Sequence, residues 1–293
     1  MSAAPRGIFL TQVVRRLAPC REHFELALEV DNFPPCVPGQ LVQVLCRAPD
    51  DSQVKGAMLR RPFSVAGVRR ASGRVEIDII GRVVGPATAW LDARRKGDLV
   101  NILGPLGRGF SVPGKNEKAW LVAGGVGLPP IRWLCEILRE NGHFCEFFFG
   151  ALSTDLIPFE LSVEPSIEGE PSLCTAPAAR LFVPTAITTD DGSAGLRGRV
   201  TDALKRRLNQ VGEREAVRVY TCGPEPMLEA VASLCAARKI PCEVALERVM
   251  GCGMATCQSC VVPIRDEVAE WKFALCCRDG PVFDATKVLW GRY

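Results

Sequence analysis

The chain has 293 residues, of which 47% are hydrophobic and 24% charged, and its formal net charge is +3. This length allows two or three domains, and so small a charge argues against nucleic acid or anionic lipid as a partner. The first residues lack the pattern of a signal peptide, and no apolar run approaches the roughly 20 residues that span a bilayer. We therefore expect a soluble, cytoplasmic protein that binds neither nucleic acid nor membrane.

The first part of the chain has the pattern of short strands separated by turns. Polar and apolar residues alternate in residues 24–31 and 74–84, as they do in strands with one buried face. Residues 34–40 and 85–90 contain Pro and Gly and indicate turns. Because no long helical period interrupts this region, we expect a barrel or a sandwich of strands.

The pattern then changes to strands that alternate with helices. Residues 118–127 form an apolar strand and a glycine turn, and a helix follows them. Residues 199–211 indicate another helix, and residues 216–228 repeat the order of strand, turn and helix. This alternation predicts a parallel, doubly wound sheet with helices on both faces. Residues 160–178 interrupt the pattern and resemble a loop insertion.

Two glycine turns fall at the ends of these predicted parallel strands. They occupy residues 124–127 and 222–224, where backbone amides could bind a pyrophosphate; the alternative is a simple turn from strand to helix. Asp190 and Asp191, near a third strand end, could accept the ribose hydroxyls of a nucleotide. Carboxylates there would disfavour a 2′-phosphate, which favours NAD over NADP.

Thiols gather near the C-terminus. Cys252, Cys257 and Cys260 have the Cys-x4-Cys-x2-Cys spacing of plant-type [2Fe–2S] proteins, and Cys276 or Cys277 could supply the fourth thiolate. A structural zinc site would need a second Cys-x2-Cys pair, and a redox pair would sit within an α/β unit. We therefore expect an iron–sulfur cluster.

The glycines of this segment suit a loop that wraps a cluster. Gly251 and Gly253 allow the tight turns that point backbone amides at sulfur, and the small residues Ala255 and Ser259 let the loop approach closely.

A further arginine-containing stretch occupies residues 60–67. Arg61 could bind a diphosphate and Ser64 could reach a flavin ring nitrogen, although an Arg on the surface before a strand would look the same.

Taken in order, these motifs resemble a known family. RPFS at 61–64, AGGVGLPPI at 123–131 and CGPEPML at 222–228, with GPLGRGF at 104–110, resemble the ferredoxin–NAD(P) reductase superfamily. The tail ERVMGCGMATCQSCVV and the later CRDGPVF resemble the electron-transfer subunits of dihydroorotate dehydrogenase B. The resemblance covers roughly residues 7–290.

The resemblance implies three domains and their ligands. These are an antiparallel FAD-binding barrel at 1–110, a parallel NAD-binding α/β domain at 111–245 and a small [2Fe–2S] domain at 246–293. It selects Cys277 as the fourth cluster ligand beside Cys252, Cys257 and Cys260. The implied FAD residues are Arg61, Pro62, Phe63, Ser64, Ile80, Gly81, Arg82, Ala87 and Thr88. The implied NAD residues are Gly124, Gly125, Gly127, Cys222, Gly223 and Pro224.

One position departs from the family pattern. The family usually has Gly-Thr at the phosphate turn, whereas this chain has Ala87-Thr88, which removes a glycine where backbone amides should approach the diphosphate.

The resemblance also implies a function. Such subunits receive electrons from the FMN of a catalytic subunit that oxidises dihydroorotate in pyrimidine synthesis, and they pass them through [2Fe–2S] and FAD to NAD+. The implied assembly has two chains of each kind, and the substrate is oxidised on the partner.

Two alternatives remain open at this point. One is a related subunit of an NADH-dependent ferredoxin–NADP oxidoreductase or of a sulfhydrogenase. The other is a cluster-binding sensor that has lost electron transfer.

Overall fold

The computed structural model describes residues 6–47, 57–71, 73–176, 182–212 and 215–291. The chain divides into two compact units. The first contains the residues up to Gly109 together with Glu247–Val282, and the second contains Phe110–Leu246 and the residues that follow Val282. The cysteine-rich segment therefore belongs to the same unit as the N-terminal strands.

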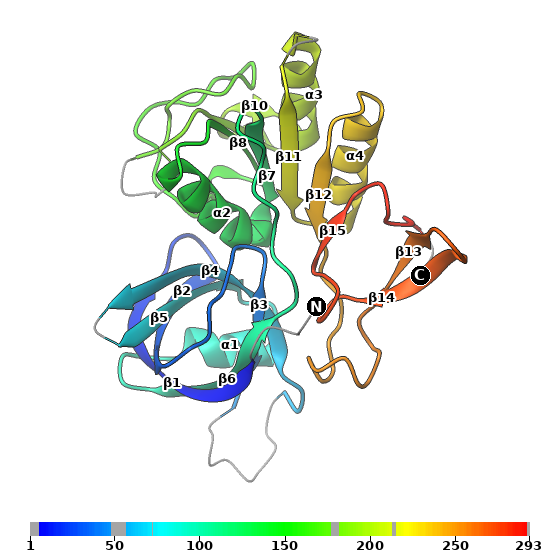
Figure 1. Ribbon diagram of the computed structural model, residues 1–293. Coiled ribbons are helices and arrows are strands. Elements are labelled where there is room, and N and C mark those ends of the chain that lie inside the picture. The colour runs from blue at the N-terminus through cyan, green and yellow to red at the C-terminus, as the bar shows by residue number, and fades with distance from the viewer. Residues whose placement is uncertain (1–5, 48–56, 72, 177–181, 213–214, 292–293) are drawn as a thin grey trace. The chain divides into compact units, whose positions relative to one another are not determined.

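Six antiparallel strands close into a barrel in the first unit (Figure 1). Neighbouring strands follow the order β1-β2-β5-β4-β3-β6, and β6 also pairs with β1. This confirms the expected barrel. The strands are β1 (Gly7–Leu17), β2 (His23–Asp31), β3 (Leu41–Leu45), β4 (Arg61–Ala71), β5 (Arg74–Arg82) and β6 (Leu99–Leu106).

The interior of the barrel is filled by the alternating apolar residues. Phe24, Leu26 and Leu28 of β2 are fully buried, as are Ile77 and Ile79 of β5. Each such side chain contributes about 1.5–3 kcal/mol when it leaves water. The alternation that predicts these strands is therefore also what holds the barrel together.

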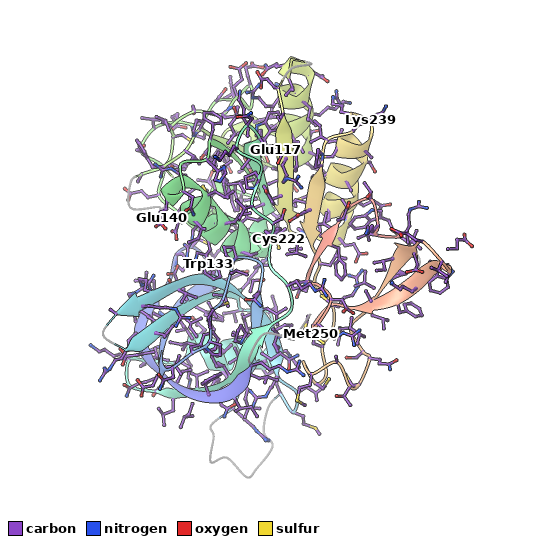
Figure 2. The ribbon with its side chains drawn as sticks, viewed as in Figure 1. Glu117, Trp133, Glu140, Cys222, Lys239 and Met250 are labelled. Atoms are coloured by element: carbon purple, nitrogen blue, oxygen red, sulfur yellow. The ribbon has the colours of Figure 1, made fainter. Side chains whose placement is uncertain are left out.

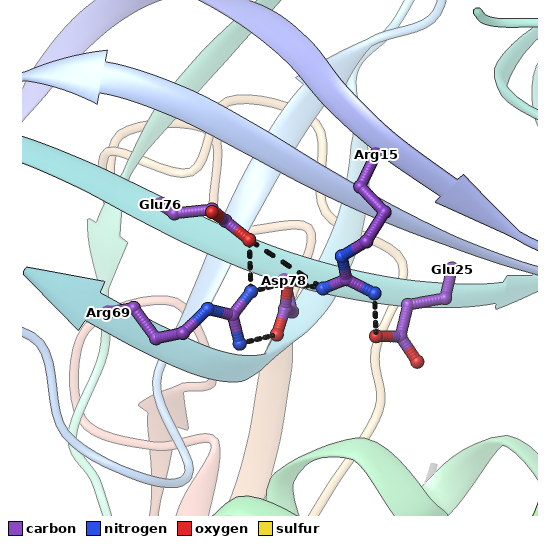
Figure 3. A network of polar contacts seen from close by, with 5 residues as sticks. All are labelled: Arg15, Glu25, Arg69, Glu76 and Asp78. Atoms are coloured by element: carbon purple, nitrogen blue, oxygen red, sulfur yellow. Dashed lines mark hydrogen bonds and ion pairs between the residues drawn. The ribbon is translucent and has the colours of Figure 1, made fainter. Parts of the chain in front are cut away.

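A network of charged side chains crosses one part of the barrel wall (Figure 3). Asp78 of β5 is fully buried and accepts hydrogen bonds from Arg69 at 2.6 and 2.7 Å and from Arg15 at 3.0 Å. Glu76 pairs with Arg69, and Glu25 accepts a bond from Arg15 at 3.2 Å. Four strands of the barrel contribute to this network.

A short helix, α1 (Pro86–Asp92), lies where the sequence indicated only a turn. The hydroxyl of Thr88 accepts hydrogen bonds from the amides of Val84 and Gly85, and Pro86 opens the helix. Leu91 is fully buried and attaches the helix to its unit. With 7 residues, the helix is too short to show a helical period in the sequence.

The second unit contains a sheet of seven strands in the order β10-β9-β8-β7-β11-β12-β15. The pairs from β10 to β12 are all parallel. The strands are β7 (Lys118–Gly124), β8 (Cys145–Ala151), β9 (Thr185–Thr189), β10 (Leu196–Arg197), β11 (Val217–Cys222), β12 (Cys242–Ala245) and β15 (Val282–Asp284).

Helices cover both faces of this sheet, as the alternating pattern predicts. Helix α3 (Val200–Gln210) packs against α4 (Glu225–Ala236), and α2 (Leu128–Glu140) lies on the other face (Figure 1). Phe147, Phe148 and Phe149 of β8 are consequently all fully buried, as expected of a strand covered on both sides.

The order of the strands places a ligand site. The chain runs outward from β7 through β8 to β9, and then crosses back to β11 on the opposite side of β7. The crevice at such a reversal, at the carboxyl ends of the strands, is where open α/β sheets bind ligands. Gly125–Gly127 form a 3-10 turn at the end of β7, and a second 3-10 turn occupies Thr154–Leu156.

Two further features complete the fold. Residues 157–176 contain no helix or extended strand, in agreement with the loop insertion expected at 160–178, whose last two residues lie outside the described residues. The cysteine-rich tail forms a hairpin of β13 (Val261–Asp266) and β14 (Glu270–Leu275), after which β15 joins the sheet beside β12. Among the described residues, no helix is long and apolar enough to cross a membrane.

Candidate functional site

Two neighbouring arginines at the start of β4 have different surroundings. Arg60 is hydrogen-bonded within the barrel, whereas the Arg61 side chain is available to a ligand. Arg60 donates to the backbone oxygens of Gln43 and Asn101 at 3.3 and 3.2 Å and also to the Asn101 side chain. Arg61 is exposed, and its guanidinium donates to the carbonyl oxygens of Leu59 and Arg60. Among the described residues Arg61 forms no ion pair, so its charge is available to a phosphate.

The residues that follow Arg61 in the RPFS motif pack closely against neighbouring strands of the barrel. Phe63 is buried against Phe24, with 6.2 Å between ring centroids. A side chain at Gly81 would meet these two rings at 2.8 and 2.6 Å, so only glycine fits there. Ile80 is buried, and Pro62 and Ser64 are half-buried.

The remaining expected flavin residues already have partners within the barrel unit. Arg82 donates two hydrogen bonds to Glu22, at 3.0 and 2.7 Å. Ala87 is buried, and the Thr88 hydroxyl also donates to Gly85 O at 3.1 Å. An open position remains at Gly85, where a side chain would meet no atom within 4 Å.

The two glycine turns of the second unit are in direct contact at the carboxyl ends of β7 and β11. A side chain on Gly127 would lie 2.1 Å from the carbonyl oxygen of Cys222, and one on Gly124 would lie 2.6 Å from Met227 Sδ. A side chain on Gly223 would come equally close to Met227, at 2.5 Å from its Cε atom. Gly125 has a left-handed backbone with φ +51°. These glycines leave backbone, rather than side chains, facing the crevice.

The strand end at Asp190 and Asp191 lies beside the end of β8. The amide of Asp190 donates to Ala151 O at 3.1 Å. Asp191 accepts hydrogen bonds from the Ser193 amide and hydroxyl at 2.9 and 2.6 Å, and the pKa of Asp191 is lowered chiefly by the Ser193 hydroxyl. Both carboxylates are exposed.

The four expected cluster thiols form two pairs. The backbone amide of Cys257 donates to Cys252 Sγ at 3.4 Å. The backbone amide of Cys277 donates to Cys260 Sγ at 3.5 Å. The first pair is accessible, with Cys257 exposed, whereas Cys260 and Cys277 are buried.

Ser259 forms hydrogen bonds within the cluster loop, whereas the sequence indicated only that its small size lets the loop approach closely. Its hydroxyl accepts a hydrogen bond from Gly251 N at 2.9 Å and lies 3.2 Å from Cys257 Sγ. Hydrogen bonds from Ser259 and, to a smaller extent, from Cys252 lower the pKa of Cys257 to about 6. A thiolate at neutral pH is the form that binds iron, so the loop favours the ligating state of this sulfur.

The neighbouring cysteines 276 and 277 have different surroundings. The pKa of Cys277 is raised to about 12, chiefly by burial and then by the Cys260 thiol, while the Ala255 backbone opposes the change. Cys276 is also buried, and its pKa is raised chiefly by burial and then by the Cys260 thiol, while Arg248 opposes the change. Of the two neighbours, Cys277 is the one that interacts with the backbone of Ala255 in the loop.

Two contacts fix the tail to the barrel. Arg108 N donates to Gly280 O at 2.5 Å, and a side chain on Gly107 would approach that oxygen to 2.3 Å. Gln43 of β3 donates to Met250 O at 3.4 Å. The motifs at 104–110 and 277–283 thus meet in space. Gln43 was not singled out from the sequence, since it occupies an ordinary position in an alternating strand.

These arrangements fit the implied groups. Among the described residues, no three His, Cys, Asp or Glu side chains converge as a single metal ion would require. Two thiol pairs instead match a cluster of two irons, each of which needs two thiolates. The charge of Arg61, which has no carboxylate partner in the part of the chain that the structure describes, suits a diphosphate, and the contacting glycine turns leave backbone amides for a nucleotide.

Comparison with known proteins agrees with this organisation. Residues 247–289 match the family model described as the iron–sulfur cluster binding domain of dihydroorotate dehydrogenase B, and residues 121–233 match the oxidoreductase NAD-binding domain. The dihydroorotate dehydrogenase B (NAD(+)) electron transfer subunit of Desulforamulus reducens is 34% identical over 254 residues, 87% of each chain. That of Geobacillus kaustophilus is 35% identical over 86% of each chain.

A solved structure is also similar. It comes from a study of flavin-based electron bifurcation by an NADH-dependent reduced ferredoxin–NADP oxidoreductase. Its TM-score is 0.74 at 25% identity, and the match covers 96% of this chain and 90% of that one.

The barrel, the nucleotide-binding sheet and the cysteine-rich tail define an NAD-linked, iron–sulfur oxidoreductase. Identity above 30% over most of both chains is decisive for the family. The chain belongs to the electron transfer subunits of dihydroorotate dehydrogenase B.

Proposed function

We propose that this chain receives electrons from the FMN of a dihydroorotate dehydrogenase catalytic subunit and delivers them to NAD+. The observation that carries the proposal is the pairing of four thiols in a tail that shares one compact unit with the flavin-motif strands. Such a unit can hold a one-electron carrier beside a two-electron carrier.

The residues assigned to each group follow from this proposal. Cys252 and Cys257 would bind one iron, and Cys260 and Cys277 would bind the other. FAD would be held by Arg61–Ser64, Ile80–Arg82 and Ala87–Thr88, and NAD by Gly124, Gly125, Gly127, Cys222, Gly223 and Pro224. When bound, the cluster passes single electrons, and FAD combines two of them with a proton as the hydride that NAD+ accepts.

The side chains and backbone of this chain bind and orient the flavin and the nucleotide. Arg61 neutralises the flavin diphosphate, and the buried layer of Phe63 and Gly81 excludes water behind it. The contacting glycine turns present backbone amides to the nucleotide, and Asp190 and Asp191 accept the ribose hydroxyls. The more accessible pair consists of the half-buried Cys252 and the exposed Cys257, and electrons from a partner would enter there.

The partner and the location are part of the proposal. The catalytic subunit would contain FMN, and the complex would contain two copies of each chain. The fourteen cysteines are all free in the structure, which suits the reducing cytoplasm.

Purification of the tagged chain from its own cells tests the proposal. We expect FAD, FMN, iron and sulfide in the complex, a bound dehydrogenase subunit, and formation of NADH when dihydroorotate is added. Light scattering would give the mass of a two-plus-two complex. A purified complex that holds both flavins and the cluster but leaves dihydroorotate unchanged would contradict the proposal.

A second candidate is supported by the similar solved structure, which covers 96% of this chain. In that case the chain would exchange electrons among NADH, ferredoxin and NADP. The same purification separates the two: reduction of ferredoxin or NADP+ by the complex, without a response to dihydroorotate, would favour this candidate.

A further inference from the structure

A polar side chain with no assigned role lies between the flavin-motif strand and the cluster loop. Gln43 of β3 is fully buried, and in the register of the barrel it lies opposite Pro62 of the flavin motif. Its backbone oxygen accepts a hydrogen bond from Arg60, the residue before Arg61, at 3.3 Å. The backbone of Gln43 is therefore fixed to the flavin-binding edge of the barrel.

The side chain of Gln43 extends to the cluster loop. Its amide nitrogen donates to the carbonyl oxygen of Met250, two residues before Cys252, at 3.4 Å. A side chain on Gly253 would lie 3.0 Å from both the amide carbon and the amide oxygen of Gln43. Gly253 also has φ +69°. The loop thus turns directly over Gln43, on both sides of the first cluster cysteine.

The amide oxygen of Gln43 is an acceptor that the fold leaves unused. Among the described residues it has no hydrogen-bond partner, although it is buried. Buried polar atoms are normally paired, because an unpaired one has lost its water without a replacement. An acceptor in this position is available to an amide of the loop that passes over it.

Hydrogen bonds around a metal site determine how its ligands are oriented and how readily it is reduced. We propose that Gln43 is a positioning residue, which fixes the cluster loop to the flavin-binding edge and so sets the cluster's environment and its electron exchange with the flavin. This inference rests on the proposed function, because it assumes that the chain holds both groups.

The test compares two substitutions in the full chain, purified with its partner. Gln43→Met removes the amide and keeps much of the volume. Thr11→Val is the matched control: Thr11 is also fully buried in the barrel, and its hydroxyl donates one bond, at 2.8 Å, to Val100 O rather than to the tail.

We expect Gln43→Met to keep FAD and to change the electron paramagnetic resonance spectrum and midpoint potential of the reduced cluster. Reduction of the cluster by NADH should slow, and loss of iron to a chelator should accelerate, each on the order of tenfold. Thr11→Val should lower thermal stability and leave the spectrum, the potential and both rates unchanged.

Several results would overturn the inference. A Gln43→Met cluster with the wild-type spectrum, potential and rates would do so, as would equal changes in Thr11→Val, which would indicate general loosening of the barrel. If Gln43→Met does not fold, Gln43→Asn, which shortens the side chain and keeps it polar, must show the same changes. A wild-type chain without cluster or flavin would instead refute the proposed function itself.

Discussion

At the scale of single residues, two adjacent cysteines allow a sharp comparison. Cys277 contacts Cys260 and the loop, whereas Cys276 is buried near Glu247 and Arg248. We expect Cys277→Ser to lose most of the iron, because an alkoxide replaces a soft thiolate poorly. Cys276→Ser should retain the cluster. Iron and sulfide analysis of the two purified variants decides between them, and the opposite result would assign the fourth ligand to Cys276.

The arginines 60 and 61 provide a second comparison at this scale. Arg61→Ala removes an exposed charge and should weaken FAD binding by about 1.5–3 kcal/mol, with little change in the unfolding midpoint. Arg60→Ala removes three hydrogen bonds within the barrel and should lower that midpoint. Fluorescence titration with FAD and thermal unfolding measure the two effects. Unchanged FAD affinity in Arg61→Ala would remove this residue from the site.

At the scale of elements, the barrel wall depends on the buried carboxylate of Asp78. Asp78→Ala should destabilise the unit by about 3 kcal/mol, at the lower end for a broken buried pair, because Arg15 and Arg69 keep partial access to water. Glu76→Ala removes a more exposed carboxylate from the same network and should cost less than about 1 kcal/mol. Urea unfolding measures the free energy of unfolding of the two variants. Equal decreases in that free energy would contradict the special position of Asp78.

The elements also show what the sequence can reveal. Alternating residues predicted β2 and β5, and the glycine turns predicted the ends of β7 and β11, because such patterns are local consequences of burial and backbone geometry. The spacing of Cys252, Cys257 and Cys260 predicts a shared cluster site, and this assignment stays a prediction.

Other features depend on contacts between distant residues. Helix α1 is too short for a periodic signal, and the meeting of Gly107 with Gly280 arises only when the tail folds onto the barrel unit. The role of Ser259 is set by a hydrogen bond across the loop to Gly251. The division into three domains and the ligand assignments remain predictions.

At the scale of the whole molecule, we expect the cysteine-rich tail to become disordered without disrupting the parallel sheet. The strands on either side of the tail, β12 and β15, are neighbours in the sheet, and Ala285 N donates to Cys242 O at 2.9 Å between them. Removal of the iron by a chelator should therefore disorder the loop and leave the far-ultraviolet circular dichroism of the helices nearly unchanged. Loss of helical signal together with the iron would show that the cluster supports the sheet as well.

The neighbouring positions of β12 and β15 have an evolutionary consequence. The segment from Glu247 to Pro281 leaves the sheet from one strand and returns on the strand beside it. An ancestor could gain or lose such a segment as a single insertion, without a new strand order and without moving either glycine turn. Relatives that share the reductase fold but differ in their iron–sulfur clusters would then differ by the presence or absence of this one segment.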